Sequence, residues 1–109
     1  MIEQRRAKRF ELRLPVEIVR TGPVPISGHG ETKNVCSRGI LFASDLKVDI
    51  GESLEYLIAL PMGFQARESV TLHCLGKVLR FEGDFTRPED PAHPFQMAAT
   101  IERYEFVRQ

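Results

Sequence analysis

The sequence predicts a single small all-β domain, a six-stranded antiparallel β-barrel. Three observations lead to this fold class. About six strand-like segments follow one another along 109 residues, turn signals separate them, and no segment shows a sustained helical period with caps. Short strands at this spacing are typical of barrels and sandwiches, and closure into a barrel removes the unpaired edges of the sheet.

The first strand has the clearest pattern, because apolar and polar residues alternate from Phe10 onward. Pro15 lies within it and has no N–H to donate, so we expect an edge position or a bulge there. Thr21-Gly22-Pro23 predicts a turn. The next segment, 24–35, is largely polar and contains two glycines, which favours a strand with bulges.

The rest of the chain repeats this alternation of strands and connections. The remaining predicted strands cover residues 40–43, 54–60, 70–78 and 95–107. The predicted connections cover residues 45–51, 61–63 and 83–94. We therefore expect one domain over residues 1–109, with a flexible basic arm at 1–9, a barrel at 10–107 and little or no C-terminal helix.

Charge is distributed unevenly although the net charge is zero. Five cations crowd the first fourteen residues, whereas acidic residues gather later in the chain. A local basic patch on a neutral protein favours a small anionic ligand over a long nucleic acid. The chain shows no signal-peptide pattern and no apolar run long enough for a membrane span, so we expect a cytoplasmic location.

No arrangement of residues predicts catalysis or metal binding. His29, His73 and His93 lie far apart in no ligand spacing, and no nucleophile or phosphate-cradling motif is present. Cys36 lies close to Arg38, but no histidine near it in sequence could act as a base. We therefore expect no catalytic residues, no metal and no cofactor, and a protein that is not an enzyme.

Two short motifs lie on either side of the first strand: Arg5-x-x-x-Arg9, and Asn34-x-Cys36-x-x-Gly39. Together they resemble the PilZ domain, the bacterial receptor module for the second messenger cyclic di-GMP. Its hallmarks are Arg-x-x-x-Arg in an N-terminal arm and Asp/Asn-x-Ser-x-x-Gly leading into a strand. Cys36 stands where the family has serine. The resemblance covers essentially the whole chain, including the glycine, basic residue and valine at 76–78.

The resemblance implies a non-enzymatic receptor whose arm becomes ordered over bound cyclic di-GMP and is then read by a downstream protein partner. From the composition we expect no DNA or RNA partner and no membrane, because the net charge is zero, Trp is absent and no apolar run is long enough for a span. The ligand-binding residues that the resemblance implies are Arg5, Arg9, Asn34, Cys36 and Gly39, and we add Arg6, which adjoins the two motif arginines, as a phosphate or stacking partner. The chemistry is suitable, because an arginine fork meets guanine N7 and O6 together and also pairs with phosphate.

Other interpretations stay open at this point. A PilZ-fold interaction module that has lost or weakened ligand binding would explain Cys36. A small barrel that binds single-stranded nucleic acid is disfavoured by zero net charge and the absence of Trp. The cations at 5–9 could also be a solvated terminus, and residues 34–39 an ordinary turn.

Overall fold

The computed structural model describes residues 13–61, 69–82, 86–88 and 90–108, and within these it contains seven strands and no helix. The strands are β1 (Pro15–Thr21), β2 (Val24–Cys36), β3 (Gly39–Ser44), β4 (Ser53–Pro61), β5 (Ser69–Glu82), β6 (Phe95–Thr100) and β7 (Arg103–Arg108). Accordingly, no helix in this part of the chain is long and apolar enough to cross a membrane.

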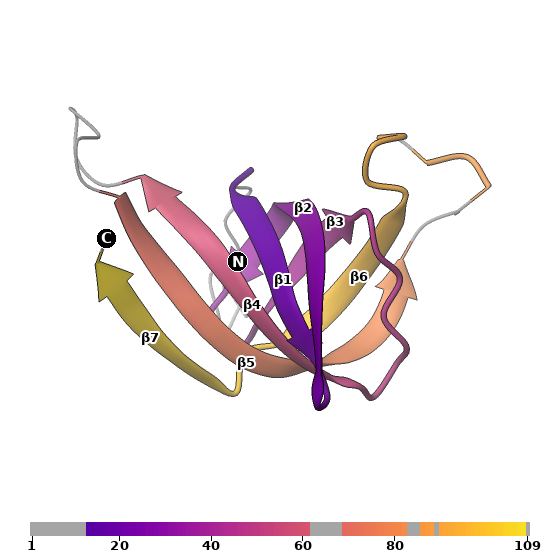
Figure 1. The fold of residues 1–109 in the computed structure, drawn as a ribbon. Helices are drawn as coiled ribbons and strands as arrows, with labels where there is room; N and C mark the ends of the chain where they lie inside the picture. Colours follow the sequence, from indigo (N-terminus) through magenta and orange to yellow (C-terminus); the bar gives the residue numbers. More distant parts are fainter. Residues whose placement is uncertain (1–12, 62–68, 83–85, 89, 109) are drawn as a thin grey trace, which may run out of the picture.

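Six of the strands form a closed antiparallel barrel, as the sequence predicts (Figure 1). Their order around the barrel is β4-β1-β2-β3-β6-β5, and pairing of β4 with β5 closes the sheet. The seventh strand, β7, pairs among the described strands with β5 alone and lies outside the closure. The predicted all-β barrel is therefore confirmed, with one additional strand attached to it.

The last predicted strand, 95–107, is two strands rather than one. Both run antiparallel to β5: β6 pairs with its residues from Val78 to Glu82, and β7 with those from Val70 to Leu75. Between them Ile101 N–H donates to the Arg38 carbonyl, and Glu102 N–H donates to the Leu75 carbonyl. The chain thus leaves β3 at this point, so the barrel ends with β6 and not at residue 107.

The barrel interior is filled by apolar side chains that alternate along the strands. Val16 and Ile18 of β1 and Leu54, Tyr56 and Ile58 of β4 are almost completely buried, as their alternation predicts. Phe42 and Tyr56 stack at 6.2 Å between ring centroids. The other fully buried large side chains are Met97, Val78, Thr32, Cys74 and Ser44.

The geometry of the first hairpin explains why the sequence predicts its turn. Gly22 and Pro23 form the two-residue connection between β1 and β2, and Gly22 has φ of 55°. Two-residue hairpin loops require positive φ at the first central residue, which glycine adopts without strain. Pro15 is the first residue of β1 and pairs only with Glu31 of β2, since the pairing of β1 with β4 begins at Val16. The missing N–H is tolerated at this one-sided position.

Candidate functional site

Two β-bulges determine which side chains reach the outer face of the barrel. In β2 the register shifts between Thr32 and Asn34, and in β5 it shifts between Val78 and Arg80. Thr32 and Val78 are fully buried. Strict alternation would therefore direct Asn34 and Arg80 inward as well. The extra residue in each strand reverses this alternation, so that both side chains face outward.

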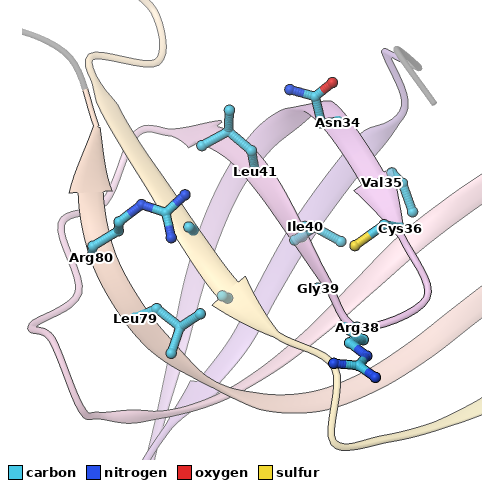
Figure 2. A pocket seen from close by; sticks show the side chains of 11 residues that line it. Asn34, Val35, Cys36, Arg38, Gly39, Ile40, Leu41, Leu79 and Arg80 are labelled. Atoms are coloured by element: carbon cyan, nitrogen blue, oxygen red, sulfur yellow. The ribbon is translucent and has the colours of Figure 1, made fainter. Parts of the chain in front are cut away.

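The outward-facing residues form a row across four neighbouring strands. Asn34 pairs with Leu41, Leu41 with Ala98, and Ala98 with Arg80. Neighbouring strands lie about 4.8 Å apart, so this row spans roughly 14 Å. Residues from two remote parts of the chain, 34–41 and 79–80, thus meet on one surface (Figure 2).

A shallow open cavity of about 190 Å³ lies over this row. We call it the outer hollow, and its wall includes Asn34, Cys36, Arg38, Leu41, Leu79 and Arg80. Apolar residues such as Leu41 and Ala98 line it, together with two arginines, Arg38 and Arg80. Figure 2 shows Leu41, Arg38 and Arg80 around the hollow. Leu79, the additional residue of the β5 bulge, exposes 51% of its surface here. An apolar lining beside cationic forks suits a flat aromatic ligand that carries negative charge.

Several polar side chains of the outer hollow have no partner within the described part of the chain. Asn34, Cys36 and Arg38 make no side-chain hydrogen bond or ion pair with another residue described in the structure. Arg80 Nε and Nη2 both donate to Glu82 Oε1, at 3.3 and 3.2 Å. This exposed ion pair is weak, and Arg80 Nη1 has no partner within the described chain.

Gly39 is explained by close packing and not by an unusual backbone conformation. The glycines with positive φ in the described chain are Gly22 and Gly51. A Cβ added at Gly39 would lie 2.5 Å from the Ala99 carbonyl oxygen on the neighbouring strand. The glycine therefore permits close packing of β3 against β6.

The structure brings together one predicted motif and leaves the other untested. Asn34, Cys36 and Gly39 all line the outer hollow. Arg5, Arg6 and Arg9 lie outside the residues that the structure describes. Arg38, Leu79 and Arg80 were not singled out as site residues from the sequence, although all three line the same hollow.

A sequence signal for the position of Arg80 does exist. The apolar series of β5 occupies even-numbered positions up to Val78 and then continues at Phe81. Phe81 packs against the core, so this change of parity marks the bulge at Leu79. The same change occurs in β2, where buried Thr32 is followed by core-packed Val35.

The histidines, cysteines and acidic residues that the structure describes form no metal-binding group. His73 Nε2 lies 2.6 Å from Glu55 Oε2, and its Nδ1 lies 3.4 Å from Glu105 Oε1 on the opposite side of the ring. Among residues 13–61, 69–82, 86–88 and 90–108, no group of His, Cys, Asp or Glu side chains could hold a metal ion. Cys74 is completely buried, and burial raises the pKa of its thiol to about 11. A protonated, inaccessible thiol is a poor nucleophile.

Comparison of the chain with family models, with curated proteins and with solved structures finds no match.

Proposed function

We propose that the protein is a PilZ-type, non-enzymatic receptor that binds cyclic di-GMP over the outer hollow. The observation that carries this proposal is the composition of the hollow. Three members of the second motif, Asn34, Cys36 and Gly39, share it with Arg38 and Arg80. The barrel uses neither the Asn34 amide nor the Arg38 guanidinium for a polar contact within the described residues.

The size of the hollow supports a ligand held between two surfaces. Its volume of about 190 Å³ is below the roughly 300–1,000 Å³ of typical small-molecule pockets. A cyclic dinucleotide therefore needs a second wall. We assign that wall to the basic arm, where Arg5, Arg6 and Arg9 would contact guanine edges and phosphates. Ordering of the arm would then form the surface that a downstream partner protein reads.

The two arginines of the outer hollow, Arg38 and Arg80, add ligand contacts to the proposed site. Guanidinium groups stack on bases, pair with phosphate and donate two parallel hydrogen bonds to guanine N7 and O6. Arg38 lies in the β2–β3 turn and Arg80 lies at the far end of the four-strand row. The ligand would lie between them, with its bases over Leu41 and Leu79. The Asn34 amide can donate to and accept from a base edge.

A second candidate function follows from Cys36. A thiol donates and accepts hydrogen bonds more weakly than the serine hydroxyl of the resembled motif. A PilZ-type interaction module with lost or weakened ligand binding would tolerate this residue. It would offer the same outer face directly to a protein partner.

Isothermal titration calorimetry with cyclic di-GMP separates these two functions. We expect binding by the wild type and a loss of affinity of about tenfold or more in Arg5→Ala, Arg9→Ala and Arg80→Ala, because each change removes charge-assisted hydrogen bonds. Arg13→Ala is the matched control. Arg13 is also exposed and pairs with Glu31, outside the residues that line the hollow.

The pattern of losses decides between parts of the proposal. No binding heat for the wild type at micromolar ligand would favour the interaction module. A loss in Arg80→Ala without a loss in the arm variants would keep the hollow as the site and remove the arm. An equal loss in Arg13→Ala would mean that only non-specific charge attraction was measured.

A further inference from the structure

The outside strand β7 pairs with β5 along residues 70–75. Its other edge is not paired with any strand of the described residues. Figure 1 shows β7 at the outer end of the sheet, beyond the barrel. Such an edge presents unpaired N–H and C=O groups and is a template for another strand.

The side chains of β7 favour contact with a further surface. Tyr104 and Phe106 lie on the face that β5 turns toward the barrel interior, since they pair with Cys74 and Leu72. Because β7 is outside the closure, they remain 61% and 65% exposed. Their rings meet edge to face with 6.1 Å between centroids. Two large aromatic side chains on an open edge form an apolar surface that a partner strand would cover.

Charge on the opposite face of β7 points to the identity of that partner. Arg103 and Glu105 are neighbours on this face, on which they pair with Leu75 and His73 of β5. Arg103 has no ion-pair partner among the described residues, and Glu105 contacts His73 at 3.4 Å while its side chain stays 70% exposed. One strand thus carries, two positions apart, an exposed anion and a cation with no partner in the described chain.

A second copy of the same strand complements this pattern. In an antiparallel edge pair related by a two-fold axis, the axis is perpendicular to the sheet and each side chain keeps its face. Residues directly opposite each other must lie on the same face, so their residue numbers differ by an even number. The axis therefore passes beside one residue and not between two residues. Centred on Tyr104, it sets Arg103 opposite Glu105 of the second copy, twice, and the two Tyr104 rings opposite each other.

The other symmetric registers lack this complementarity. An axis centred on Glu105 brings two carboxylates directly opposite each other, which destabilises a strand pair. An axis centred on Phe106 sets Glu105 opposite Val107 and leaves Arg103 without an anion. The register centred on Tyr104 alone satisfies both charges and also places Phe106 diagonally to Tyr104 of the second copy.

We propose that two copies of the chain associate through antiparallel pairing of their β7 edges, with the two-fold axis beside Tyr104. The sheet of each barrel then continues through β7 into the other copy. This association is independent of the proposed ligand, because none of the residues that line the outer hollow belongs to β7.

Analytical ultracentrifugation of the full chain over a wide concentration range, without any ligand, tests this dimer. We expect reversible dimers of the wild type. Arg103→Glu sets glutamates opposite each other and Glu105→Arg sets arginines opposite each other. Each variant alone should raise the dimer dissociation constant by about tenfold or more. An equimolar mixture of the two variants should recover association, since every opposed pair is then Arg with Glu.

The controls keep the result interpretable. Arg13→Glu makes the same charge change at an exposed arginine outside β7 and should leave association unchanged. Circular dichroism and thermal melting verify that each variant is folded. A wild type that stays monomeric at every concentration would overturn the proposal. Dimers that persist in both single variants, or folded variants whose mixture fails to associate, would overturn it as well.

Discussion

The polar groups at the seam of the barrel, by which we mean residues 100–102 between β6 and β7, differ in their contacts from those in the outer hollow. At the seam, where β6 gives way to β7, the Thr100 carbonyl accepts a hydrogen bond from the Tyr56 hydroxyl at 3.0 Å. The Thr100 hydroxyl accepts one from the Lys77 N–H at 2.9 Å and donates to Glu102. In the outer hollow the side chains of Asn34, Cys36 and Arg38 make no such contact within the described chain.

The difference separates residues that the fold requires from residues that it does not. Polar groups at the seam are needed to satisfy a strand that changes partners, since an unsatisfied buried group is costly. No buried side-chain nitrogen or oxygen in the described residues lacks a partner. Asn34, Cys36 and Arg38 make no such side-chain contact within the described residues. We attribute their identities to the ligand proposed above.

The largest expected effect tests the seam. A Cβ added at Gly76 would lie 1.8 Å from the Thr100 carbonyl oxygen. Because that atom belongs to the backbone and already accepts the Tyr56 hydroxyl, the strands must move apart. We expect Gly76→Ala to lower the free energy of unfolding by about 2–3 kcal/mol, measured by urea denaturation.

Lys77→Ala is the matched control for this variant. Lys77 is the next residue of β5 and its side chain is exposed, so its removal should change stability by less than about 0.5 kcal/mol. If Gly76→Ala were as stable as the wild type, the close approach at the seam would not constrain the barrel, and the contrast with the outer hollow would lose its basis.

A smaller effect should appear at high pH, through the buried thiol beside the seam. Burial raises the pKa of Cys74 from 9.0 to about 11, while the thiol of the unfolded chain keeps the lower value. Between these two pH values the folded state therefore holds more protons than the unfolded state, and stability falls as pH rises. We expect this thiol to contribute a loss of about 1–2 kcal/mol across that range.

Denaturation of the wild type and Cys74→Ala under reducing conditions, between pH 9 and 11, measures this contribution. The variant starts from a lower stability because it leaves a cavity, but its decline with pH should be shallower. Some decline should remain, because burial also raises the pKa of Tyr56, which pairs with Cys74 across β4 and β5. Equal slopes for both proteins would show that the thiol is not protected at the seam.

The sequence predicts the barrel well because its strands are half-buried. Alternation in β1 and β4, and the turn at Gly22, follow from burial on one side and from loop geometry, both of which are local properties. The division of 95–107 into β6 and β7 depends instead on which strand lies alongside. Ile101 N–H bonds to the carbonyl of Arg38 in the β2–β3 turn, and Glu102 N–H bonds to the carbonyl of Leu75. Both contacts join remote parts of the chain, so no local sequence pattern predicts them.

Only part of the outer hollow could be predicted from the sequence. Asn34, Cys36 and Gly39 are close in sequence and form a recognisable motif, so their common location follows once β2 and β3 pair. Arg80 reaches them only through the pairing of β3 with β6 and of β6 with β5. The change of apolar parity after Val78 shows that β5 has a bulge, but only the register shows what the bulge directs Arg80 toward.

The smallest expected effect concerns Cys36, the residue that distinguishes the two proposed functions. Cys36 is half-buried in the hollow and has no hydrogen-bond partner in the described chain. In Cys36→Ser a hydroxyl replaces the thiol, and one added neutral hydrogen bond to cyclic di-GMP is worth about 0.5–1.5 kcal/mol. We expect calorimetry to show up to about tenfold tighter binding, with unchanged thermal stability.

Cys36→Ala, which supplies no hydroxyl, should bind no more tightly than the wild type. Equal affinities for the serine variant and the wild type would remove residue 36 from the ligand contacts, and the hollow would then act through its arginines and Asn34 alone.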